Sequence, residues 1–209
     1  MKLVLPILVT PGGIATEADW QGVSDARQKL MDFFEATHRP RNYIHILRPL
    51  TPYCIEPQDY FLPSGWSPGD GDSTPWSRVG MWLKTIYPPE KMVKAHQLNS
   101  SDDLIYLVFL KDFHNPIEDH TDESYSWWGW GGPMTTNEVP MRWALVDYDT
   151  IDDLQFGSLQ PDARTQQREG NKALGVIAHE LGHTLGYAHT ETIPHSLMWS
   201  WWEFPEVIL

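Results

Sequence analysis

The sequence predicts one α/β (α+β) domain in which a mixed, twisted sheet of about five strands packs against two long helices. Strand-like apolar runs lie at 3–9, 104–110 and 143–147. Two other segments, 16–36 and 162–185, repeat their apolar residues at helical spacing. The chain has 209 residues, of which 41% are hydrophobic and 21% charged, so it suits a single packed core and would be cramped as two domains.

The first half of the chain alternates strand and helix. Residues 3–9 contain Pro6 and lack a clear small-residue cleavage site, so we interpret them as a first strand and not as a signal peptide. The amphipathic helix at 16–36 comes next, followed by a strand at 43–47. The stretch 51–77 is rich in proline, glycine and aspartate, which predicts a long surface loop.

The second half supplies the remaining strands. A short helical segment at 76–86 should stop at Pro88–Pro89. The continuous apolar runs 104–110 and 143–147 predict buried strands. Between them, the glycine-interrupted segment 127–133 predicts an edge strand.

Charge and cysteine content exclude several functions. The chain has 15 Lys+Arg against 28 Asp+Glu, a formal net charge of −13, which disfavours binding to nucleic acid or to an anionic membrane. No apolar run is long enough to span a bilayer. Cys54 is the only cysteine, so neither an internal disulfide nor a cysteine-based zinc cluster can form. We expect Cys54 to be a small buried residue and not a latency switch.

The last predicted helix, 162–185, carries a metal-binding pattern. Its apolar stripe is formed by residues at offsets of three, four, seven and eleven: Leu174, Ile177, Ala178, Leu181 and Leu185. His179 and His183 are four residues apart and therefore project from one helix face, where two imidazoles can bind one ion. Gly186 ends the helix, which allows His189 to return and supply a third nitrogen.

Three neutral imidazoles with an open fourth position are typical of catalytic zinc. Zinc lowers the pKa of its bound water to about 7 and polarises a scissile carbonyl. Glu180 adjoins the first ligand, so it is the natural general base, able to take the proton of the water and return it to the leaving amine. The sequence therefore predicts one Zn²⁺ held by His179, His183 and His189.

These residues, together with Met198, resemble the metzincin clan of zinc endopeptidases, whose pattern is H-E-x-x-H-x-x-G-x-x-H followed by a methionine turn. The short gap between His189 and Met198 is similar to that of matrixins and reprolysins. Astacins and serralysins carry a zinc-associated tyrosine two residues after this methionine, where the present chain has Ser200.

The resemblance implies a single catalytic domain over 1–209, with an upper subdomain of about 1–186 and a very small lower subdomain of about 187–209. It implies that Met198 lies beneath the metal as an apolar floor. It also implies a peptide or protein substrate that pairs with an edge strand near 129–132. A monomer is expected, and the resemblance favours secretion although the chain has no convincing signal peptide.

Weaker features leave alternatives open. The loop 114–123, with His114, His120 and several carboxylates, could hold a structural Ca²⁺ or Zn²⁺, but a solvated acidic loop is the simpler interpretation. The segment 67–72 resembles a calcium loop without its distal glutamate, so a turn is expected. We assign His195 to an ordinary loop position, with lining of a substrate pocket as the alternative.

The eleven tryptophans suggest other functions. They concentrate at 127–130 and 199–202, where they could stack on sugars, although packing of the lower subdomain is the favoured interpretation. One alternative function is a glycan- or protein-binding module with structural zinc. Another is a protease selective for glycosylated proteins. We assign Tyr187 to packing.

Overall fold

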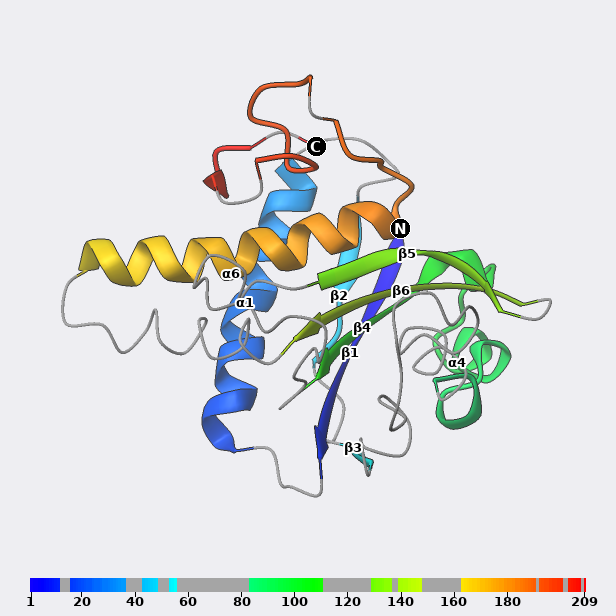
Figure 1. Cartoon of the computed structure of the whole chain (residues 1–209). Coiled ribbons are helices and arrows are strands. Elements are labelled where there is room, and N and C mark those ends of the chain that lie inside the picture. The colour runs from blue at the N-terminus through cyan, green and yellow to red at the C-terminus, as the bar shows by residue number, and fades with distance from the viewer. Residues whose placement is uncertain are drawn as a thin grey trace, which may run out of the picture.

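The computed structural model describes separate stretches of the chain. The described residues are 1–11, 16–36, 43–48, 53–55, 83–110, 129–136, 139–147, 163–190, 192–200, 203–207 and 209. Within them, the predicted mixed α/β fold is confirmed (Figure 1). The described helices include none that is both long and apolar enough to cross a membrane.

The described strands form one sheet. Its order is β2 (Ile44–Ile46), β1 (Lys2–Pro11), β4 (Leu104–Leu110), β6 (Val139–Asp147) and β5 (Gly129–Thr136). The first four run parallel, and β5 pairs antiparallel with β6 at the end of the sheet. β3 (Tyr53–Ile55) pairs with the end of β1.

Both faces of the sheet are buried, as a parallel sheet requires. Successive side chains of β1 alternate between the two faces: Val4 and Leu8 join one core cluster, whereas Leu5 and Ile7 join the other. This explains why the strands have continuous apolar sequences and do not alternate with polar residues.

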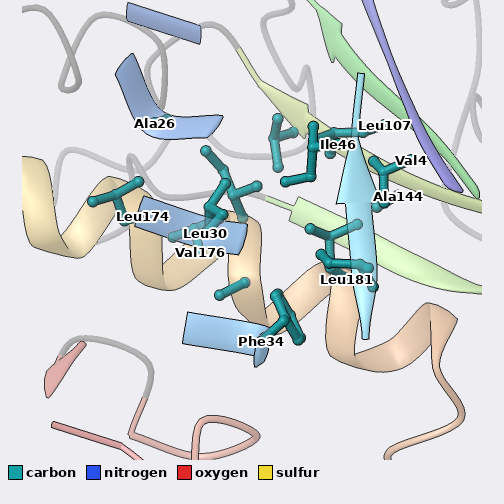
Figure 2. Packing of buried hydrophobic residues seen from close by; sticks show 14 of the residues in the cluster. Val4, Ala26, Leu30, Phe34, Ile46, Leu107, Ala144, Leu174, Val176 and Leu181 are labelled. Carbon is teal, nitrogen blue, oxygen red and sulfur yellow. The ribbon is translucent and has the colours of Figure 1, made fainter. Parts of the chain in front are cut away.

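The larger core cluster lies beneath two helices, α1 (Glu17–Ala36) and α6 (Ala163–Thr184). Leu30 and Phe34 of α1 meet Leu174 and Leu181 of α6 in this cluster (Figure 2). The second cluster, on the opposite face, includes Leu83. Both long helices begin and end within about one residue of the predicted bounds.

The remaining sequence predictions need corrections. The helical segment around Leu83 does end before Pro88, but Pro89 then begins a helix that was not predicted, α4 (Pro89–Ala95). Proline suits this first helical position because the N–H it lacks would have no partner within the helix. β3 lies inside the stretch predicted to be a surface loop, because its backbone adds to the edge of β1.

β6 begins at Val139, four residues before the predicted Trp143, because its first half pairs with the antiparallel strand β5. β5 confirms the predicted edge strand and extends it to Thr136. Residues 127 and 128 of that prediction, and 76–82 of the predicted helix, lie outside the described part of the chain.

The described residues of 187–209 form turns that pack onto the two long helices. Phe204 and Val207 are buried in the larger core cluster, and the ring of Phe204 lies 4.9 Å from that of Phe33 in α1. This segment covers the core over α6 and beside the C-terminal end of α1 (Figure 1).

Candidate metal centre

The end of α6 is built to reverse the chain. Gly186 has a φ of 91°, a conformation that glycine adopts without a Cβ penalty. The Gly186 N–H donates to the His183 carbonyl and the Tyr187 N–H to the Gly182 carbonyl, the two bonds of a Schellman motif. The chain therefore turns back immediately after the helix, and His189 reaches the face that carries the two helical histidines.

The three predicted histidines meet at one point. The Nε2 atoms of His179 and His183 are 3.1 Å apart, those of His183 and His189 3.1 Å, and those of His179 and His189 3.2 Å. This is the one group of potential metal-ligating side chains found among the described residues. The predicted association of these histidines is therefore confirmed, and a metal ion could bind between them.

Hydrogen bonds fix the tautomers of the two helical histidines. His179 Nδ1 lies 2.9 Å from the Leu197 carbonyl oxygen, and His183 Nδ1 lies 2.9 Å from that of Tyr187. Because a carbonyl can only accept, each Nδ1 carries the proton and each neutral ring presents a bare lone pair at Nε2. Two such lone pairs face each other at 3.1 Å, an arrangement that a cation between them stabilises.

The spacing also fits zinc. Tetrahedral ligands at Zn–N distances of 2.0–2.1 Å are roughly 3.3–3.4 Å from one another, close to the observed separations. Donation of the second ring N–H to a backbone carbonyl is the usual arrangement of zinc-bound histidine. All three side chains fit zinc in donor type and spacing, and His179 and His183 also fit it in tautomer.

Burial favours the neutral form of the two helical imidazoles, those of His179 and His183. Removal of His179 from solvent lowers its pKa to about 4, against the opposing effect of the Leu197 carbonyl. Burial also lowers the pKa of His183. Neutral imidazole is the form that binds a metal, so both side chains are ready to act as ligands at neutral pH.

The centre is open on one side. His179 is buried, His183 is partly buried and His189 is exposed. A fourth ligand from solvent or from a substrate can therefore approach from the side of His189. The described residues supply three ligands and leave one side accessible, an arrangement typical of catalytic zinc, whereas structural sites are closed by four protein ligands.

Glu180 directly follows His179 in α6, and its carboxyl group is buried. Only 6% of its surface is exposed, and burial raises its pKa to about 8. A nearby cation favours the ionised form of a carboxyl group. Glu180 can therefore exist as a proton donor or acceptor near neutral pH, depending on what occupies the centre.

Met198 lies against the ligand helix. It is buried, and a Cβ added at Gly182 would lie 2.6 Å from its Sδ atom. Because that distance is too short for a Cβ contact, a larger residue at position 182 would crowd Met198. Gly182 directly precedes His183 in α6. The described contacts place Met198 beside the helix that carries two of the histidines.

Other predicted candidates do not join the centre. His195 is exposed and pairs with Glu203, its Nδ1 lying 2.6 Å from the carboxylate oxygen. Trp199 is exposed, and Tyr187 packs against the larger core cluster as expected. The side chain of Cys54, the loops 67–72 and 114–123, and the tryptophans at 127, 128, 201 and 202 lie outside the described residues.

Sequence reasoning missed the residues that support the histidines. The carbonyls of Leu197 and Tyr187 orient two rings, and a backbone carbonyl has no signature in a sequence. Arg142 of β6 donates to the Thr184 carbonyl in the last turn of α6 at 2.6 Å, although 42 positions separate the two residues.

Comparison with protein-family models, with curated proteins and with solved structures gives no match.

Proposed function

We propose that the protein is a zinc-dependent endopeptidase of the metzincin type. The observation that carries the proposal is the convergence of three Nε2 atoms within 3.2 Å of one another, two of them with fixed lone pairs. Glu180, whose carboxyl group is buried, directly follows His179 in α6. His179, His183 and His189 would hold the zinc. Zinc would supply Lewis-acid chemistry, lowering the pKa of a water molecule and polarising the scissile carbonyl.

Glu180 performs the proton transfers of this proposal. As a carboxylate it accepts the proton of the attacking water, and as a carboxylic acid it donates that proton to the leaving amine. Its burial supports this role, because a carboxyl group whose pKa is raised towards neutrality can both accept and release a proton.

The edge strand β5 supplies the proposed docking site for the substrate. β5 lies at the end of the described sheet order, and α6 packs against it. An extended peptide would add antiparallel or parallel to the outer edge of β5 near 129–132 by main-chain hydrogen bonds. Such pairing is largely independent of side-chain identity, which suits a protein substrate.

The test compares the wild type with Glu180→Gln, which removes the base but keeps the shape of the side chain. Each protein is loaded with zinc and incubated with a peptide library, and new termini are identified by mass spectrometry. We expect both proteins to bind one zinc ion per chain. We expect the variant to cleave about 10²–10⁴-fold more slowly, the usual contribution of a general base.

Three results separate the competing functions. Equal cleavage by the wild type and Glu180→Gln would refute the assigned base. Zinc binding without cleavage of any peptide or glycoprotein would favour the binding module with structural zinc. Cleavage of a glycoprotein that disappears after deglycosylation would favour the protease selective for glycosylated proteins.

A further inference from the structure

The peptide unit between Leu197 and Met198 is held at both ends. Its carbonyl oxygen accepts from His179 Nδ1 at 2.9 Å, and its N–H donates to Ser196 Oγ at 3.2 Å. Because the peptide unit is planar, these two bonds fix the direction in which the carbonyl points at the His179 ring. The hydroxyl of Ser196 therefore acts on His179 through a backbone group.

Ser196 also reaches the other side of the centre. Its Oγ lies 2.8 Å from Thr190 Oγ1, and Thr190 directly follows His189. Ser196 is only 4% exposed, and its own carbonyl accepts from the N–H groups of Trp199 and Ser200. The hydroxyl that joins the two sides thus sits on a backbone that is itself held in place.

We propose that Ser196 and Thr190 are positioning residues that connect His179 to His189 outside the metal. The connection runs from the His189–Thr190 backbone through the two hydroxyls to the Leu197–Met198 peptide unit, and from there to His179 Nδ1. It couples the ligand on the rigid helix to the ligand on the following turn. The inference rests on the proposed zinc site.

The coupling is expected to act on zinc affinity more than on folding. Zinc withdraws electron density from an imidazole, which makes its second N–H a stronger donor, and hydrogen bonds in series polarise one another. Removal of the connecting hydroxyls also lets His189 leave its position, so the three nitrogens converge less often. Loss of such a supporting group usually weakens metal binding about 10–100-fold.

The test uses Ser196→Ala and Thr190→Val, which remove a hydroxyl each, and Thr190→Ser, which retains it. The matched control is Thr184→Val: Thr184 is buried beside His183, and its hydroxyl bonds to the Leu181 carbonyl at 2.6 Å, outside the connection. Zinc affinity is measured by competition with a chromophoric chelator. The absorption spectrum of the Co²⁺-loaded proteins reports the ligand geometry.

We expect Ser196→Ala and Thr190→Val each to weaken zinc binding about 10–100-fold and to change the Co²⁺ spectrum. Thr190→Ser and Thr184→Val should stay within about threefold of the wild type. Because the two hydroxyls act in series, the double variant should bind no more weakly than Ser196→Ala alone.

The outcomes distinguish the inference from the proposed function. A wild type that binds no zinc overturns the proposed function. A wild type that binds zinc, with Thr190→Val and Ser196→Ala indistinguishable from Thr184→Val, overturns the inference alone. If Ser196→Ala fails to fold, Thr190→Val decides the question, because Thr190 is only partly buried.

Discussion

Replacement of Gly182 by alanine should destabilise the protein, although the same change in an exposed helix stabilises by about 1 kcal/mol. The added Cβ would lie 2.6 Å from Met198 Sδ and 3.4 Å from Leu209 Cδ1. Ordinary contacts between such atoms begin near 3.5 Å, so the sulfur must move by about 1 Å. Met198 is 1% exposed, and its displacement therefore compresses the surrounding core.

The size of the effect follows from two opposing contributions. Overpacking of a well-filled core costs about 1–3 kcal/mol, and the better helix propensity of alanine returns about 1 kcal/mol. We therefore expect the free energy of unfolding to fall by about 1 kcal/mol. Zinc affinity should fall as well, because Met198 shares a peptide unit with the carbonyl that holds His179.

The assay is urea denaturation in the presence of a chelator, followed by circular dichroism. Gly182→Ala is measured alone and in the Met198→Ala background, which removes the sulfur. In that background the substitution should stabilise by up to about 1 kcal/mol, so the two sites should be coupled by roughly 2 kcal/mol. Stabilisation in both backgrounds would show that Met198 does not crowd the helix and would refute the reasoning.

Two further predictions concern the scaffold around the centre. Arg142→Met removes the charged donor to the Thr184 carbonyl and should lower the free energy of unfolding by about 1.5–3 kcal/mol; urea denaturation that shows a change below about 0.5 kcal/mol would contradict this. Tyr106 is buried and donates to the Tyr87 carbonyl at 2.7 Å, and burial raises its pKa above the ordinary value. The raised pKa gives stability that is fully present below pH 10 and is lost as pH rises above it, so the advantage of the wild type over Tyr106→Phe should shrink by about 1.4 kcal/mol per pH unit above 10. A constant difference from pH 9 to 11 in parallel urea titrations would show that Tyr106 ionises as readily in the folded protein as in the unfolded chain.

Sequence patterns predicted the fold where side chains alone decide the structure. The apolar run of β4 and the helical stripes of α1 and α6 gave accurate bounds, because burial on one or both faces determines these residues. The early start of β6 and the existence of β3 depend on pairing with another strand, which leaves no local pattern. The patterns predicted that a helix ends before Pro88–Pro89 but did not predict that α4 begins at Pro89.

In the candidate site, too, the sequence predicts some features, whereas others depend on how distant parts of the chain fold. The spacing of His179 and His183 sets their common face, and Gly186 marks the turn that brings back His189. The groups that orient the rings are backbone carbonyls, whose positions depend on how the following turns fold. Ser196 could have been noticed as a hydroxyl two residues before Met198, but its contact with Thr190 exists only in the folded chain.

The three histidines are close neighbours in the chain, whereas the sheet that supports their helix joins distant segments. All three histidines lie in the short segment from His179 to His189. By contrast, Val9 of β1 pairs with Leu110 of β4, which is far from it in the sequence. Loop closure costs about 2 kcal/mol less for the short segment, because this cost grows with the logarithm of loop length. We therefore expect the histidines of a partly unfolded chain to bind the proposed zinc ion. Such binding would form the last turn of α6 before the sheet is complete. Because the ion would then bind the unfolded chain as well, it should stabilise the native state by less than its affinity for that state implies.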